Sequence, residues 1–183
     1  LGLPVGSALL NTLAQLDQKE GQTQSAEENF EKAIVAARVE NNRRFEAGAM
    51  TNLAAIKRSR GQYTQARALV ERAARIREDL GDEAGVASSA VALSGLLRDL
   101  GELSAAHQSA DRAITFAESA GDRARYGDAL ALRASIRMDQ GKLDDALEDL
   151  QASIAIWHEV DEPGSLLKSR LTLAKLLGRQ GDY

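Results

Sequence analysis

Glycine recurs at a fixed spacing of 40 residues along this chain of 183 residues. The glycines of this series are Gly21, Gly61, Gly101, Gly141 and Gly181. A second series of breaks lies halfway between them, at Asn41-Asn42, Gly81-Asp82, Gly121-Asp122 and Asp161-Glu162. Such a period is the signature of a solenoid, in which similar units stack on their neighbours. We therefore expect a single array with full repeats 1–40, 41–80, 81–120 and 121–160 and a partial fifth repeat, 161–183.

Each repeat carries the pattern of two amphipathic α-helices. Apolar residues recur at intervals of three and four on both sides of the glycine, which places them on one face of a helix. The seventh position before the glycine is small in every repeat: Ala14, Ala54, Ser94, Ala134 and Ala174. The fifth position after it is always alanine: Ala26, Ala66, Ala106 and Ala146. Small side chains let two antiparallel helices approach closely, so the pattern predicts an all-α fold of nine helices with these alanines buried at the crossings.

Polar residues and a proline after the breaks predict where the helices begin. Asp82 and Asp122 stand where the first helix of a repeat needs an N-cap, and Pro163 stands at a first helical position. The residues three positions after the glycine are expected to cap the second helices: Thr64, Ser104 and Asp144.

The composition argues against catalysis. The chain has no cysteine, which excludes disulfides, thiolate metal sites and thiol nucleophiles. Of its two histidines, His107 stands four residues before Asp111, but no further His or Cys completes a metal site. No apolar run approaches the roughly 20 residues of a membrane span. We expect no enzyme activity, no cofactor, no bound metal and no membrane partner.

Charge is nearly balanced over the whole chain but uneven along it. The formal net charge is -4, whereas residues 41–80 hold nine basic and four acidic residues. A basic stripe could meet nucleic acid or an acidic partner. However, no aromatic side chains interleave with it, and i,i+4 pairs such as Glu71 and Arg75 explain it as a solvated helix face. We therefore expect no nucleic-acid partner.

Two repeats carry the fullest form of a further pattern. Leu53-Ala54 is followed by Gly61-Gln62-Tyr63 and Ala66, and Leu173-Ala174 is followed by Gly181-Asp182-Tyr183. This pattern resembles the tetratricopeptide repeat (TPR), whose usual unit is about 34 residues. The longer unit here resembles the long-helix subclass of kinesin light chains, Pins-type polarity scaffolds and bacterial STAND-type regulators. The resemblance implies an α-solenoid of antiparallel helix pairs wound into a right-handed superhelix. Arginine far outnumbers lysine and alanine is abundant, which favours a bacterial protein, and we expect it to be cytoplasmic.

The resemblance also implies that the first helix of each pair lines a concave groove. The groove positions in this sequence give the candidate partner-binding residues: Asn11, Gln15, Thr51, Ala55, Arg58, Val91, Gly95, Arg98, Ala131, Ser135 and Met138. The floor is mostly small, which leaves room for an extended peptide or an amphipathic helix. Arg58 and Arg98 could bind a carboxylate of that ligand. Alternatively, the small residues only let the superhelix curl tightly, and the arginines are solvated.

Two functions remain open at this point. The array is either a scaffold that binds a peptide or helix of a partner protein in its groove, or the regulatory array of a larger bacterial signalling or transcription regulator. The absence of an initiator Met and the end within a repeat lead us to expect a segment of a longer protein.

Bulky residues near the C-terminus predict one packing anchor and one uncovered surface. Trp157 takes a position held by Ala37, Arg77 and Ala117 in other repeats, and we expect it to pack against the last helix; the alternative is an exposed partner contact. That last helix should expose a leucine stripe, because the second helix of its repeat is missing. Self-association through this stripe is a possible consequence; the alternative is that Lys and Arg residues form a sufficient polar cap.

Overall fold

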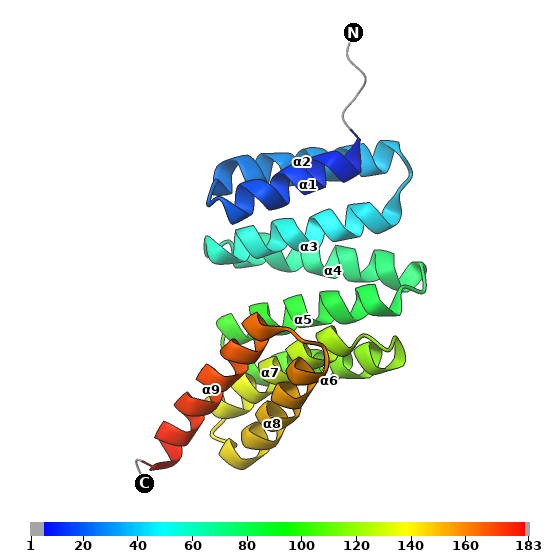
Figure 1. Cartoon of the computed structure of the whole chain (residues 1–183). Helices are drawn as coiled ribbons and strands as arrows, with labels where there is room; N and C mark the ends of the chain where they lie inside the picture. The colour runs from blue at the N-terminus through cyan, green and yellow to red at the C-terminus, as the bar shows by residue number, and fades with distance from the viewer. Residues whose placement is uncertain (1–5, 182–183) are drawn as a thin grey trace. The chain divides into compact units, whose positions relative to one another are not determined.

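The computed structural model describes residues 6–181, and in that range every regular element is an α-helix. The described residues form nine helices in succession (Figure 1): α1 Ser7–Lys19, α2 Thr23–Val39, α3 Arg43–Ser59, α4 Tyr63–Asp79, α5 Glu83–Asp99, α6 Leu103–Ser119, α7 Arg123–Asp139, α8 Leu143–Glu159 and α9 Pro163–Gly181. The predicted helices are thus confirmed, and seven of them, α2 to α8, are 17 residues long. The motif residues Asp182 and Tyr183 lie outside the described range.

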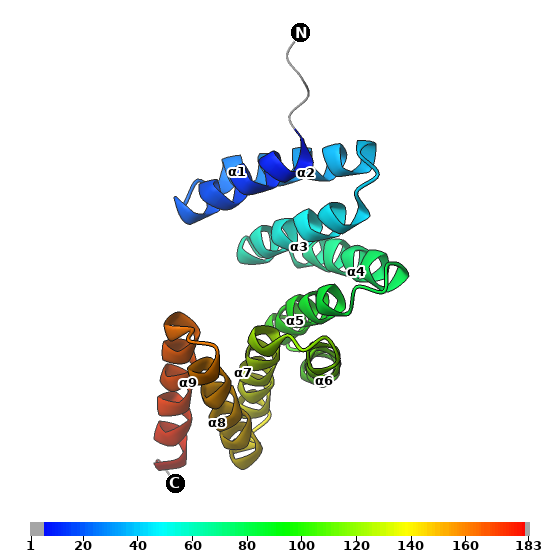
Figure 2. The same ribbon diagram turned by 45° about the vertical axis from the view of Figure 1, so that its right-hand side comes forward.

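The chain divides into two compact units, residues 1–85 and 86–183. In the N-terminal unit, α1 packs on α2, α3 packs on α4, and α2 joins the two pairs by packing on α3. In the C-terminal unit, α6 packs on α7 and α7 packs on α8, which also packs on α9. Figure 2 shows α7, α8 and α9 running side by side, each antiparallel to the next. Both units are therefore stacks of antiparallel helix pairs.

Left-handed backbone geometry ends the helices at the predicted breaks. Six turn glycines have φ between 62° and 77°. At the two breaks without glycine, Asn41 and Asp161 adopt φ of 54° and 53°. Glycine takes this conformation without steric cost, and Asn and Asp are the side chains that tolerate it best. The turns therefore explain why the sequence repeats these residue types.

The predicted caps are correct for the first helices and wrong for the second. Asp82 accepts a hydrogen bond from the backbone N–H of Gly85 at 3.1 Å, and Asp122 accepts one from Arg125 at 3.0 Å. Pro163 is the first residue of α9. The second helices begin one residue before the expected caps, which lie inside the first turn: Thr64, Ser104 and Asp144. In α6 the N–H of Leu103 bonds to the carbonyl of Gly101 at 2.9 Å, so this helix begins directly after the glycine turn.

The predicted alanines form the helix crossings. Ala66, Ala106 and Ala146 are all buried. At the α5–α6 crossing, the Ser94 hydroxyl donates to the carbonyl of Ala106 at 2.8 Å, so the one polar residue in the small column is also satisfied. The described residues contain no helix long and apolar enough to cross a membrane.

Trp157 is buried and packs between α7 and α9, which confirms it as a packing anchor. Its Nε1 donates to the hydroxyl of Ser169 on α9 at 3.1 Å. The indole also lies over Gly127 on α7, where an added Cβ would come within 2.8 Å of the ring. The hydrogen bond to Ser169 and the space left by the missing side chain of Gly127 therefore hold the indole in place.

The last helix exposes the predicted leucine stripe. Leu167, Leu171 and Leu177 are 59%, 56% and 51% exposed, whereas Leu176 is buried against the preceding pair. Ala174 is exposed too, although its counterparts in the four preceding repeats are buried. The side of α9 that contacts a second helix elsewhere in the array is therefore open.

Candidate ligand groove

Two adjoining pockets lie along α7 and α9 in the C-terminal unit. The first has a volume of about 180 Å³ and is lined by Asp128, Ala131, Leu132, Ser135, Trp157, Ser165, Lys168, Ser169 and Thr172. The second has a volume of about 260 Å³ and is lined by Arg98, Ser135, Met138, Asp139, Thr172, Lys175 and Arg179. Ser135 and Thr172 line both, so the pockets form one groove, which we call the α7–α9 groove.

Helical periodicity explains why these residues share the groove. Ala131, Ser135 and Met138 are spaced by four and three residues and lie on one face of α7. Thr172, Lys175 and Arg179 follow the same rule on α9. Both hydroxyls of the floor bond to the carbonyl four residues earlier in their own helix, at 3.0 Å. The groove floor is therefore made of small residues whose hydroxyls are already satisfied.

One end of the groove is basic. The Arg98 Nε lies 2.6 Å from the Asp139 Oδ2, and both side chains remain about one-third exposed. The Arg179 Nη1 donates to the carbonyl of Met138 at 3.3 Å, which leaves its positive charge without a carboxylate at that bond. Lys175 is exposed and makes no hydrogen bond or ion pair among the described residues. Three cationic side chains thus face one carboxylate at this end.

The other end carries opposite charges. Desolvation by the groove walls raises the pKa of the Asp128 carboxyl, although part of the side chain stays exposed, and the positive charges of Lys168 and Arg125 oppose this shift. The first pocket is backed by the buried Trp157. This end carries one acidic and one basic side chain, so its formal charges cancel.

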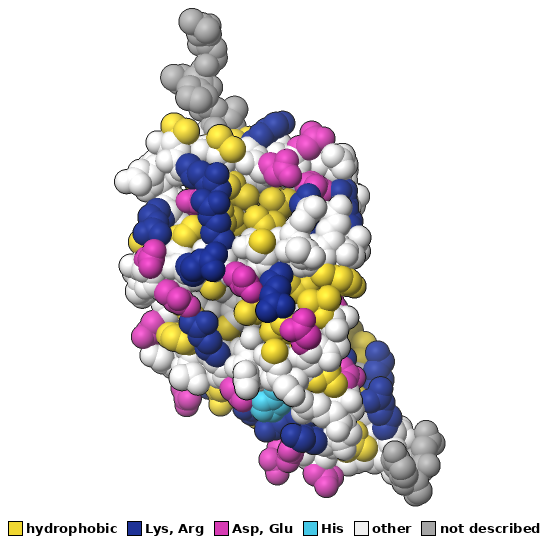
Figure 3. All heavy atoms as spheres, turned by 180° about the vertical axis from the view of Figure 1, so that it is seen from behind, with side chains coloured by type: hydrophobic (Ala, Val, Ile, Leu, Met, Phe, Trp, Pro, Cys, Tyr) yellow, Lys and Arg dark blue, Asp and Glu magenta, His cyan; other side chains and the backbone are white. Residues whose placement is uncertain are grey.

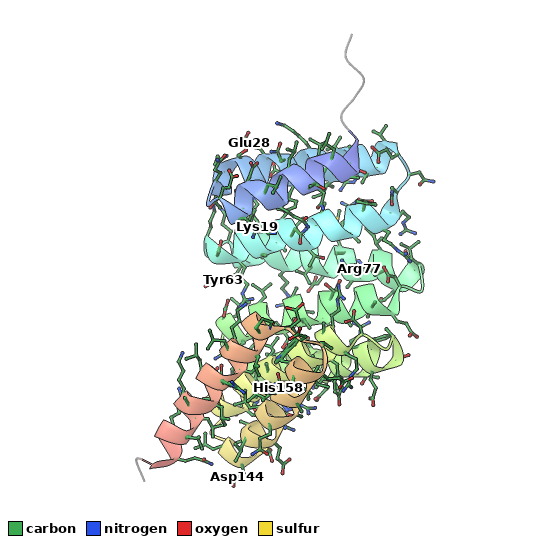
Figure 4. The ribbon with its side chains drawn as sticks, viewed as in Figure 1. Lys19, Glu28, Tyr63, Arg77, Asp144 and His158 are labelled. Carbon is green, nitrogen blue, oxygen red and sulfur yellow. The ribbon has the colours of Figure 1, made fainter. Side chains whose placement is uncertain are left out.

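The predicted groove residues of the N-terminal unit lie on α1 and α3. Gln15 and Ala55 are exposed, and Arg58 is partly buried. The Oδ1 of Asn11 accepts a hydrogen bond from Asn52 at 3.4 Å. The Thr51 hydroxyl accepts one at 3.0 Å from Arg77, a buried arginine of α4 labelled in Figure 4.

The predicted residues of the C-terminal unit are Val91, Gly95, Arg98, Ala131, Ser135 and Met138, on α5 and α7. The last four line the α7–α9 groove. Gly95 is buried and Val91 is partly buried.

Sequence reasoning missed the contribution of α9. Lys168 and Asp128 both stand thirteen residues before a glycine of the 40-residue series, and Lys175 stands six before one, so the repeat positions contained a signal for these three. Thr172 occupies no predicted groove position, and only the packing of α9 beside α7 reveals it.

The two histidines take part in surface and helix-end contacts. The His107 Nδ1 lies 3.0 Å from the Asp111 Oδ2, and Asp111 also pairs with Arg133 at 2.8 Å. His158, labelled near the end of α8 in Figure 4, lies 3.1 Å from the Nη2 of Arg170 on α9. Among the described residues, no group of three or more His, Asp or Glu side chains could hold a metal ion.

Ion pairs occupy much of the basic stripe of residues 41–80. Arg67 pairs with Glu71 at 2.9 Å, and Arg72 pairs with the buried Glu46 at 3.2 Å. The space-filling view in Figure 3 shows Lys and Arg side chains interspersed with Asp and Glu on one face. This pattern agrees with a solvated, ion-paired face.

The comparisons with known proteins concern family and fold. The family described as "MalT-like TPR region" matches residues 3–181. The structure of BtubC (BKLC) from P. vanneervenii is similar with a TM-score of 0.79 and 22% identity, covering 96% of this chain and 74% of that one. The structure of a Rap protein complexed with Competence and Sporulation Factor is similar with a TM-score of 0.85 and 13% identity. The match covers 97% of this chain and 49% of the Rap protein. The structure of the kinesin light chain TPR-like repeats of Podosopora anserina is similar with a TM-score of 0.73 and 20% identity. The match covers 96% of this chain and 88% of that one.

At these identities the likeness shows the fold, which is that of a TPR-like α-solenoid. This chain spans about half the length of the Rap protein that it matches. None of the curated protein sequences compared matches this chain.

Proposed function

From the premise that this chain belongs to the MalT-like TPR region family, we propose that it is a protein-interaction module that binds a peptide of a partner in the α7–α9 groove. The observation that carries the proposal is the continuity of the two pockets through Ser135 and Thr172. An extended peptide fits such a groove because alternate side chains can enter successive pockets. The Rap protein complexed with Competence and Sporulation Factor supports the proposal as a protein of this fold that has a bound partner.

Selection from a random peptide library displayed on phage tests this proposal. We expect the chain to enrich a family of related peptides, and we expect Ser135→Trp to abolish their binding because the indole fills the point shared by both pockets. Ala155→Trp is the matched control, since Ala155 is exposed on α8 outside both pockets.

Circular dichroism verifies that Ser135→Trp and Ala155→Trp fold. If Ser135→Trp does not fold, Thr172→Phe takes its place as the variant that fills the groove. Selected peptides that bind the groove variants as tightly as the unaltered chain would refute the groove as their site. Failure to enrich any peptide family counts against peptide binding itself.

A second candidate function is the regulatory array of a larger bacterial signalling or transcription regulator. The MalT-like family match favours it. Determination of the whole reading frame tests this candidate: an adjoining ATPase, kinase or DNA-binding domain is the expected result, and a frame that encodes only TPR repeats would argue against it. A cytoplasmic location in a bacterium belongs to both candidates as part of the proposal.

A further inference from the structure

We propose that the basic end of the α7–α9 groove is a subsite for an acidic residue of the bound peptide, so that the module selects peptides by a carboxylate side chain. This inference rests on the proposed peptide-binding function and specifies its partner. The subsite consists of Lys175 and Arg179 on α9 and the Arg98–Asp139 pair, which α5 and α7 contribute. We call it the carboxylate subsite.

Charge at the subsite favours an anion. Asp139 is the one carboxylate among the lining residues, and Arg98 already pairs with it at 2.6 Å. Lys175 is exposed with no partner among the described residues, and the described bond of Arg179 in the pocket is to a neutral carbonyl. An incoming carboxylate could accept charge-assisted hydrogen bonds from both without displacing the existing ion pair.

The subsite has a volume of about 260 Å³, which is enough for one acidic side chain. It shares Ser135 and Thr172 with the first pocket, whose lining contains one acidic and one basic side chain, Asp128 and Lys168. A peptide can therefore place an acidic side chain in one pocket and a neutral one in the other.

The test compares one selected peptide with its amide counterpart. We expect the phage selection to enrich Asp or Glu at one position, and a fluorescein-labelled peptide from it to lose at least about tenfold in affinity when that residue becomes Asn or Gln. The double variant Lys175→Gln/Arg179→Gln should bind the acidic peptide about as weakly as the unaltered chain binds the amide peptide. Arg170→Gln is the matched control, because Arg170 is on the same helix but lines neither pocket.

The outcomes separate this inference from the proposed function. Groove-dependent binding without any preference between acid and amide peptides overturns the carboxylate subsite and leaves peptide binding intact. Absence of all peptide binding overturns both. Free glutarate serves as a competitor: if it displaces the peptide at comparable concentrations, the subsite takes a small carboxylic acid, and the assignment to a peptide side chain fails.

Discussion

At the scale of single residues, the chain accommodates large side chains at a small-residue position by placing a glycine opposite. The position that holds Trp157 in the fourth repeat holds Arg77 in the second and alanine in the first and third. A Cβ on Gly127 would come within 2.8 Å of the Trp157 ring, and one on Gly85 would come within 2.8 Å of the Arg77 Cδ. Each bulky residue thus occupies volume that its neighbouring glycine leaves open.

Gly127→Ala should therefore destabilise the protein. The added methyl group overpacks the recess against Trp157, at a cost of about 1–3 kcal/mol, which outweighs the roughly 1 kcal/mol that alanine gains over glycine within a helix. Urea unfolding followed by circular dichroism measures the change. Gly48→Ala is the control, because its Cβ meets nothing within 4 Å, and it should be neutral or stabilising. Equal stability of the two variants would disprove the overpacking explanation.

At the scale of helices, the C-terminal unit replaces an apolar contact with an ionic one. Arg133 on α7 makes a two-pronged contact with the buried Asp149 of α8, at 3.0 and 2.7 Å. Arg137 donates to the same carboxylate at 2.8 Å. The hydrogen bonds to Asp149, together with the charge of that carboxylate, raise the pKa of the Arg133 guanidinium further, so the guanidinium stays charged. The equivalent positions of the second repeat hold Leu53 and Leu69, which pack in one apolar cluster.

Because these positions are equivalent, we expect a second substitution to restore the stability that a first one removes. Asp149→Leu alone should destabilise the protein by about 3 kcal/mol, because it leaves Arg133 largely desolvated without its main partner. The double variant Arg133→Leu/Asp149→Leu should recover a large part of the loss, because it reproduces the leucine pair of the second repeat. A double-mutant cycle from urea unfolding gives the coupling free energy. A double variant no more stable than Asp149→Leu would contradict the equivalence.

The open side of α9 suggests self-association. Exposed leucines on one helix favour association between chains, since water is then excluded from apolar surface. We expect sedimentation velocity to show concentration-dependent association that Leu171→Lys/Leu177→Lys removes. The variant Val35→Lys/Val39→Lys is the control, because both valines are exposed on α2. A monomer at all concentrations would show that the polar residues of α9 are a sufficient cap.

At the scale of the whole molecule, the sequence predicted the helices far better than the site. The two series of breaks together located every turn between the helices, because a left-handed turn restricts residue identity strongly. The N-caps of the second helices were misplaced by two residues. These helices are capped by Gln62, Glu102 and Lys142, whose side chains make no capping hydrogen bond.

Groove residues were harder to predict, because a pocket depends on helix packing as well as on repeat position. Residues of α7 and α9 enclose the groove, and Arg98 joins them from α5. No sequence pattern indicated that Arg98 would pair with Asp139 or that Thr172 would join the floor. The division of the chain into a single array of repeats ending at 40, 80, 120 and 160 remains a prediction.

We propose that a partner peptide binds in the α7–α9 groove. Amide and methyl chemical-shift mapping by NMR, with a peptide selected on the chain, tests it most directly. We expect the chemical-shift changes to concentrate at residues that line the groove: Ala131, Ser135, Met138, Thr172 and Lys175. Shifts confined to α6 and the exposed face of α8, with these groove residues unchanged, would contradict it.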